Sequence, residues 1–95
     1  MKHDKPISCV ICAFNEADRI GDVLNAASGH PLIDEIIVVD DGSTDGTSEL
    51  ARGFAGVRII PLWPNRGKTQ ALAAGIAATS SDYLMLLDAD LEGAT

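Results

Sequence analysis

The feature that most constrains the fold is a regular alternation of short apolar runs with amphipathic segments. Each apolar run is short enough to be a strand buried on both faces of a sheet. The clearest amphipathic segment places Ile20, Val23, Leu24 and Ala27 at positions i, i+3, i+4 and i+7, which is the spacing of one helix face. Alternation of this kind predicts right-handed strand–helix–strand units and a mostly parallel sheet with flanking helices, in the α/β class.

The apolar runs and the helical spacing set the expected bounds of the elements. The expected strands are Ile7–Ala13, Glu35–Asp40, Val57–Leu62 and Asp82–Asp88. The expected helices are Ala17–Ala27, a short one carrying Leu50, Ala51 and Phe54, and an alanine-rich one that opens at Pro64-Asn65-Arg66-Gly67-Lys68 and runs to about Ala78. Asn15 is expected to cap the first helix. With no linker or repeat in view, residues 1–95 are interpreted as a single domain.

Charge and hydropathy exclude several classes of partner. The formal net charge of −7 argues against nucleic acid or an anionic membrane surface. No segment approaches the roughly 20 apolar residues of a membrane span, and the polar start Met1–Pro6 is unlike a signal peptide. We therefore expect a cytoplasmic protein without a membrane segment.

Cys9 and Cys12 form a C-x-x-C pair, a spacing found in redox motifs and in zinc sites. Both fall in the strand expected at Ile7–Ala13, where residues three apart point to opposite faces. We therefore expect two buried, reduced cysteines in the core, as is usual in the cytoplasm.

The last apolar run, Tyr83–Leu87, ends in two carboxylates one residue apart, Asp88 and Asp90. Residues i and i+2 of a strand point to the same side, so both carboxylates can face one object. Two such charges about 4 Å apart repel by roughly 4 kcal/mol at an effective dielectric constant near 20. A hard divalent cation removes this repulsion and prefers oxygen ligands. The sequence therefore predicts a metal site where ligands bind in open α/β sheets, at the carboxyl ends of the strands.

A second acidic pair, Asp40 and Asp41, ends the second expected strand and precedes the loop Gly42–Gly46. Neighbouring strand residues point to opposite sides, so the two acids are expected to do different jobs. One can accept hydrogen bonds from a base or a ribose, and the other can brace the turn. The alternative is that Asp41, Ser43 and Asp45 are ordinary turn and helix-cap residues.

Two further segments lie at the same expected edge. Asn65-Arg66-Gly67-Lys68 places two cations at the start of a helix, where free amides and the helix dipole attract anions. Its spacing is not that of a P-loop, and a solvated loop is the alternative. After the first strand, Phe14 could lie against a base and Glu16 could touch a ribose, or they could serve as a staple residue and a cap.

Taken together and in this order, these motifs resemble the family 2 glycosyltransferases of the GT-A fold. The matching elements are Pro6-Ile7-Ser8, Phe14-Asn15-Glu16, Val39–Thr47, Asn65–Lys68 with Ala71 and Gly75, and Leu87–Asp90. The resemblance spans Pro6 to Glu92. It implies that the chain is the N-terminal, donor-binding half of a Rossmann-like GT-A fold.

The resemblance also implies a nucleotide-sugar site, formed by Ala13, Phe14, Glu16, Asp41, Lys68 and Asp88. Ala13, Phe14 and Glu16 would line the nucleotide pocket, and Asp41 would pair with the base. Lys68 would lie near the donor phosphates. The donor is expected to be linked to UDP or GDP.

For the metal, Mn²⁺ or Mg²⁺, the resemblance implies a D-x-D motif made of Asp88 and Asp90. In a branch of the family resembling dolichyl-phosphate mannosyltransferases, a glutamine two residues further on also meets the metal. Glu92 holds that position here and is a candidate third ligand.

The family places its acceptor site and catalytic base after the D-x-D, so the base is expected beyond Thr95. We therefore expect a metal-dependent glycosyltransferase of unknown acceptor, with the 95 residues alone inactive. A sugar-phosphate nucleotidyltransferase and a non-catalytic nucleotide-binding remnant are the alternatives. A receiver-type domain fits less well, because its acidic residues would follow strands one and three. A homodimer that covers an exposed apolar face or an unpaired sheet edge is also expected.

Overall fold

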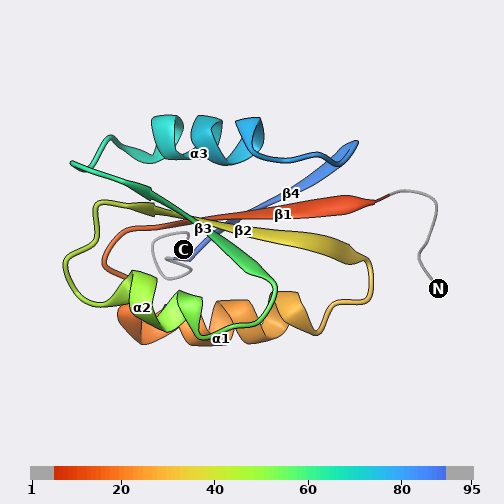
Figure 1. Cartoon of the computed structure of the whole chain (residues 1–95), viewed down its shortest axis with the longest axis horizontal. Coiled ribbons are helices and arrows are strands. Elements are labelled where there is room, and N and C mark those ends of the chain that lie inside the picture. The colour runs from red at the N-terminus through yellow and green to blue at the C-terminus, as the bar shows by residue number, and fades with distance from the viewer. Residues whose placement is uncertain (1–5, 90–95) are drawn as a thin grey trace.

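The computed structural model describes residues 6–89, which form one layer of strands between two layers of helices (Figure 1). Within these residues there are four strands, β1 (Ile7–Ala13), β2 (Ile33–Asp41), β3 (Val57–Leu62) and β4 (Tyr83–Asp88). The same part of the chain has three helices, α1 (Ala17–Ser28), α2 (Thr47–Arg52) and α3 (Lys68–Ala77). The predicted order of elements is confirmed.

Most element bounds agree with the prediction, and the differences lie at the ends. β2 is longer than expected, since it pairs with β1 from Ile33 onwards and runs to Asp41. α2 ends at Arg52, so Phe54 lies beyond the helix. The expectation that Asn15 caps α1 is wrong, because Glu16 is the N-cap residue and the Asn15 side chain accepts a hydrogen bond from the Thr44 amide instead.

The sheet is entirely parallel within the described residues, with strand order β3-β2-β1-β4. The chain moves outward from β1 to β3 and then returns to place β4 on the other side of β1. Cys12 of β1 is paired with both Val39 of β2 and Asp88 of β4. The reversal between β1 and β4 is the topological switch point, where open α/β sheets bind ligands at the carboxyl ends of their strands.

Two apolar clusters hold the layers together, one on each face of the sheet. Helices α1 and α2 cover one face and α3 covers the other (Figure 1). Alternate residues of β1 divide between the clusters, so Cys9 packs on the α1 side and Cys12 on the α3 side. Both cysteines are buried and free, as predicted.

Helix α3 lies unusually close to the sheet at Gly75. A Cβ atom at this position would lie 2.4 Å from Cγ1 of Val10 and 2.9 Å from Cγ2 of Val39. The absence of a side chain therefore sets the distance between α3 and the sheet, and so the position of the helix start at Lys68.

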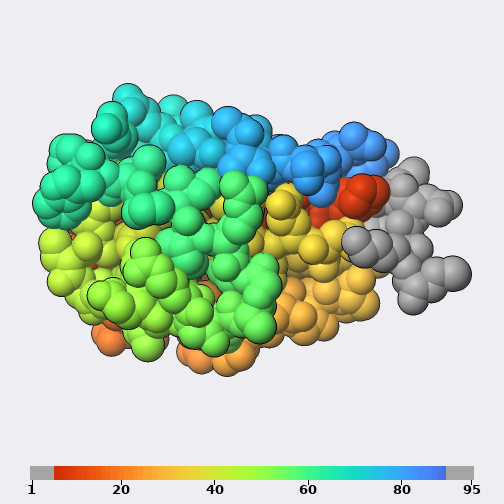
Figure 2. Space-filling model, in the orientation of Figure 1, coloured from red at the N-terminus to blue at the C-terminus, as the bar shows by residue number. Residues whose placement is uncertain are grey.

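The loops that follow the strands gather at one end of the molecule. Figure 2 shows the segments after β2 (yellow-green) and β3 (teal) together at the left, away from the N-terminal end. The β2–α2 loop touches the β3–α3 loop closely, since a Cβ at Gly42 would lie 2.7 Å from the Asn65 backbone nitrogen. Gly42 has a φ of 80°, so this contact depends on glycine. Among the described helices, none is long and apolar enough to cross a membrane.

Candidate functional site

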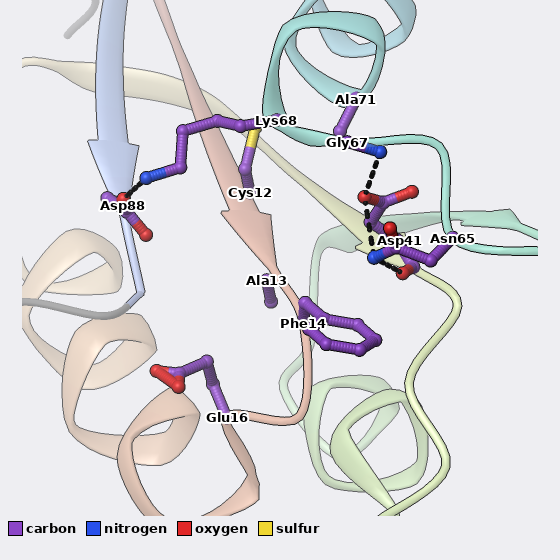
Figure 3. A pocket seen from close by; sticks show the side chains of 10 residues that line it. All are labelled: Cys12, Ala13, Phe14, Glu16, Asp41, Asn65, Gly67, Lys68, Ala71 and Asp88. Atoms are coloured by element: carbon purple, nitrogen blue, oxygen red, sulfur yellow. Dashed lines mark hydrogen bonds and ion pairs between the residues drawn. The ribbon is translucent and has the colours of Figure 1, made fainter. Parts of the chain in front are cut away.

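A cavity of about 250 Å³ opens at the carboxyl ends of β1, β2 and β4 (Figure 3). Its walls come from the β1–α1 connection, the end of β2, the start of α3 and the end of β4. The lining residues are Cys12, Ala13, Phe14, Glu16, Asp41, Asn65, Gly67, Lys68, Ala71 and Asp88. The cavity therefore lies at the topological switch point of the sheet.

The Asp41 carboxylate forms one wall and holds the β3–α3 loop against β2. Its Oδ1 accepts a hydrogen bond from the Arg66 amide at 2.7 Å, and its Oδ2 accepts from the Gly67 amide at 2.9 Å. The Asn65 side chain donates to Oδ2 at 3.0 Å and to the Asp41 carbonyl at 2.9 Å. A carboxylate oxygen can accept two hydrogen bonds, so Oδ1 keeps capacity for another donor.

The neighbouring Asp40 points to the opposite side and does not line this cavity. Its carboxylate accepts hydrogen bonds from the Ser43 amide, at 3.0 Å, and from the Ser48 hydroxyl. Asp40 thus braces the β2–α2 turn. The two adjacent acids are engaged by different segments, as the alternation of strand side chains predicts.

Lys68 and Asp88 form an ion pair across the cavity (Figure 3). Lys68 is the first residue of α3, and Asp88 is the last residue of β4. Their side chains are 67% and 33% exposed, so both charges remain accessible to a ligand from solvent.

Cys12 forms part of the cavity floor between these charges. Burial raises the pKa of its thiol, and the nearby Asp88 carboxylate raises it further. Lys68 opposes this effect and Asp41 adds to it. The thiol therefore stays protonated at neutral pH, which makes Cys12 a packing residue rather than a nucleophile.

The β1–α1 connection contributes an aromatic ring and a carboxylate to the cavity. Phe14 is 48% exposed and presents its ring beside Asp41 (Figure 3). Glu16 is 8% exposed, and its carboxylate lies 3.5 Å from Nη1 of Arg19. The β1–α1 connection therefore gives the cavity a flat apolar face and one carboxylate that can accept hydrogen bonds.

All six residues predicted to form the nucleotide-sugar site line this one cavity. Of the predicted metal ligands, Asp88 lies there, while Asp90 and Glu92 fall outside the described residues. Within residues 6–89, no cluster of three or more His, Cys, Asp or Glu side chains could hold a metal ion. Arg66 contributes its amide to Asp41 and is not a lining residue.

Sequence reasoning did not assign four of the lining residues to the site, namely Cys12, Asn65, Gly67 and Ala71. Asn65, Gly67 and Ala71 belong to the motifs that resemble the family 2 glycosyltransferases, so the family resemblance could have assigned them to the site. Cys12 could have been found from its position, because it is the inward residue of β1 nearest to the strand's carboxyl end on the α3 side.

The parallel sheet with acidic residues at its switch point defines an α/β protein of the GT-A type, and known proteins support this class. Glucosyl-3-phosphoglycerate synthase from Mycobacterium tuberculosis, in a crystal structure with Mn²⁺, UDP and glucosyl-3-phosphoglycerate, matches with a TM-score of 0.80 and 35% identity over 92% of this chain and 34% of that chain. A mannosyltransferase from Pyrobaculum calidifontis, in complex with GDP-Man and Mn²⁺, matches with a TM-score of 0.85 and 25% identity over 93% of this chain and 28% of that one. The predicted fold class is confirmed.

Sequence comparison gives the family. A glucosyl-3-phosphoglycerate synthase of Mycolicibacterium paratuberculosis is 39% identical over 99 residues, covering 95% of this chain and 30% of the relative. A poly-beta-1,6-N-acetyl-D-glucosamine synthase of Staphylococcus epidermidis is 36% identical over 88 residues, covering 88% of this chain and 21% of the relative. Residues 8–94 match the model described as glycosyl transferase family 2, and the chain belongs to that family. It spans between 21% and 34% of the length of these four proteins.

Proposed function

We propose that this chain is the donor-binding half of a glycosyltransferase, which transfers a sugar from a nucleotide-diphosphate donor to an acceptor. The observation that carries the proposal is the cavity at the switch point, which is lined by all six residues that the family resemblance implicates. The two structural neighbours were crystallised with UDP and with GDP-Man. These complexes support a donor linked to UDP or GDP.

The geometry of the cavity supports a specific placement of the donor. Phe14 offers a flat face for the base. Oδ1 of Asp41 can accept a second hydrogen bond, which suits an N–H group on the edge of the base. Glu16, on the same side, would accept from the ribose. Lys68 at the start of α3 would meet the diphosphate, where its charge adds to the helix dipole.

The proposed metal ligands Asp88, Asp90 and Glu92 are all carboxylates, and carboxylate oxygens suit a hard divalent cation such as Mn²⁺ or Mg²⁺. Asp88 already lies in the cavity wall, and it is followed in the sequence by Asp90, the second acid of the proposed D-x-D, and by Glu92, the candidate third ligand. Asp41 is not assigned to the metal, because its carboxylate already accepts hydrogen bonds from the amides of the β3–α3 loop. When bound, the metal supplies charge neutralisation for the leaving diphosphate.

The chemistry at the acceptor is assigned to residues beyond Thr95. There a base would remove the proton of an acceptor hydroxyl, whose oxygen would form the new bond to the anomeric carbon as the diphosphate leaves. The described residues bind and orient the donor, and Lys68 stabilises charge that develops on the phosphates. The 95-residue chain is expected to bind nucleotide without transferring sugar.

Two further proposals concern the state of the protein. A homodimer would cover the edge strand β4, where Tyr83, Leu84 and Leu86 are 47%, 40% and 47% exposed. A cytoplasmic location is the second proposal, and the two buried, unpaired cysteines are compatible with a reducing compartment.

Calorimetric titration of the chain with UDP and with GDP, each with and without Mn²⁺ or Mg²⁺, tests the main proposal. Metal-dependent binding of at least one nucleotide is expected. A folded sample that binds neither nucleotide under any of these conditions would contradict it.

A further inference from the structure

The β1–α1 and β2–α2 loops are joined by hydrogen bonds between residues that do not line the cavity. The Asn15 amide donates to Oγ of Ser43 at 2.8 Å, and the Thr44 amide donates to Oδ1 of Asn15, also at 2.8 Å. Asn15 has a φ of 52°, in the left-handed region that non-glycine residues rarely adopt. These two bonds hold Asn15 in that conformation.

A second pair of hydrogen bonds fixes the start of α1. The Glu16 amide donates to Oγ1 of Thr47 at 3.0 Å, and the Ala17 amide donates to Oδ2 of Asp45 at 3.1 Å. The Thr47 hydroxyl in turn donates to Oδ1 of Asp45. Thr47 is fully buried, so its hydroxyl is shielded from competing water.

These bonds replace a cap that α1 does not obtain locally. Within the described residues, the side chain at the N-cap position, Glu16, makes no capping hydrogen bond. Asp45 supplies a carboxylate to the helix start from another loop, where negative charge is favoured by the helix dipole. The first turn of α1 is thus tied to residues about 30 positions later in the chain.

We infer that Asp45 and Thr47 are positioning residues for the donor site, acting through the backbone of residues 15–17. Neither lines the cavity, but they hold the amides of Glu16 and Ala17 and thereby set the directions of Phe14 and Glu16, which do line it. The inference rests on the proposed function, because it assigns these two residues to binding of the nucleotide part of the donor. It also gives a role to Asp45-Gly46-Thr47, which follows Asp40 and Asp41 in the matched motif but does not line the cavity.

If Asp45 and Thr47 have only a structural role, their substitution lowers the stability of the protein and leaves its nucleotide affinity unchanged. The test therefore compares Thr47→Val with Ser8→Ala. Ser8 is also fully buried, and its hydroxyl bonds to Glu35 at 2.6 Å and to Ser81 at 2.7 Å, near the amino-terminal ends of the strands and away from the cavity. Both substitutions delete a buried hydroxyl with two partners, but only one is connected to the cavity. Thr47→Ser keeps the hydroxyl and serves as the rescue.

Nucleotide affinity is measured by calorimetry with UDP and GDP in the presence of Mn²⁺, at a temperature where every variant is folded. Amide hydrogen exchange of Glu16 and Ala17 is measured in parallel without nucleotide. Thr47→Val is expected to speed exchange at Glu16 and to weaken nucleotide binding by about tenfold, because small displacements of binding groups have effects of this size or larger. Ser8→Ala and Thr47→Ser should stay within about twofold of the unsubstituted chain, since neither breaks the cross-loop contact.

Asp45→Ala is a second, milder variant for the case in which Thr47→Val does not fold, because Asp45 is exposed. It should speed exchange at Ala17 and weaken nucleotide binding in the same direction. Unchanged affinity in the folded variants, beside normal binding by the unsubstituted chain, would overturn the positioning role alone. Failure of the unsubstituted chain to bind nucleotide would overturn the proposed function, and with it the positioning role.

Discussion

Lys68 at the start of α3 pairs with Asp88 at the end of β4, so the cation assigned to the diphosphate and the carboxylate assigned to the metal neutralise each other. A metal that binds Oδ2 of Asp88, the oxygen that contacts Lys68, would displace the Lys68 ammonium. The displaced ammonium would then be available to the phosphates beside it. This exchange would couple the two binding events, because each partner of the ion pair gains a new partner of opposite charge.

Lys68→Met is therefore expected to have opposite effects on the two ligands. Binding of Mn²⁺ alone should tighten about threefold to fivefold, because an exposed ion pair contributes under about 1 kcal/mol. Binding of UDP or GDP with metal present should weaken. Mn²⁺ titration followed by electron paramagnetic resonance, together with calorimetry for the nucleotide, measures both. Arg66→Met removes an exposed cation that does not line the cavity and should change neither. Effects of the same sign on both ligands would argue against the exchange.

Asp41→Asn is expected to weaken nucleotide binding whether or not metal is present. The new amide group would face the backbone amides that Asp41 now accepts from, so the β3–α3 loop loses a partner. A stability loss of about 1–3 kcal/mol should accompany the change, as for other buried groups left unpaired. Glu35→Gln, on the same strand but away from the cavity, is the matched control. If Asp41→Asn binds nucleotide like the control, Asp41 has no role in the site.

The positions of Asp41 and Asp88 could be predicted from sequence because each ends a short apolar run, and parallel strands bring such ends together. The hydrogen-bond partners of Asp41 could not be predicted from the sequence. Asn65, Arg66 and Gly67 reach it from 24 to 26 residues away, and nothing in their local pattern indicates which acid they contact.

The cap of α1 shows the same limit. Local pattern favoured Asn15 because asparagine often precedes a helix. In the structure the Asp45 carboxylate accepts from the first amide of the helix instead, while Asn15 has a left-handed backbone and bonds to Ser43 and Thr44. Tertiary contact thus overrides a local preference at the place where the cavity is built.

The hydrogen bonds of Asp45 should make stability depend on pH in a defined window. Desolvation alone would raise the pKa of the Asp45 carboxyl, but the hydrogen bonds from Thr47 and Ala17 outweigh it and the pKa lies below its usual range. A carboxyl with a depressed folded-state pKa stabilises the protein above its unfolded pKa, about 3.9, and the stabilisation is lost as the pH falls from there through the folded pKa.

The corresponding experiment measures the free energy of unfolding of Asp45→Asn and of the unsubstituted chain from pH 7 downward. The difference should be constant near neutral pH and shrink below about pH 4. Asp18→Asn removes a negative charge that lies in the first turn of α1 itself. Its effect on the pH dependence of the free energy of unfolding should be smaller than that of Asp45→Asn. If the difference in the free energy of unfolding grows as the pH falls, the Asp45 carboxyl does not have a lowered pKa in the folded protein.

Gly75→Ala should destabilise the protein by about 1–3 kcal/mol, the usual effect of overpacking a close contact. The added methyl group would meet Val10 and Val39, and α3 must move to make room. Gly21→Ala, in helix α1, meets nothing within 4 Å and should be neutral or stabilising by up to about 1 kcal/mol. Denaturant unfolding of both variants measures the contrast, and equal effects would show that α3 is not held at van der Waals distance.

Self-association is expected through the β4 edge. Light scattering of the chain across a concentration series should show a dimer, and Leu86→Lys should weaken it because an edge lysine opposes strand pairing. Leu50→Lys places the same charge on a similarly exposed leucine of α2 and should leave the dimer intact. A monomer at high protein concentration would exclude this mode of association.

Whether this cavity binds the donor nucleotide can be measured by following the backbone amide shifts as UDP or GDP is added with Mg²⁺. Changes are expected at residues that line the cavity, above all Ala13, Phe14, Gly67 and Lys68, with little change at Ser8 or Ser81 near the amino-terminal ends of the strands. Removal of Mg²⁺ should reduce the response. Shifts that centre elsewhere, or no shifts with either nucleotide, would contradict the assignment of this cavity as the donor site.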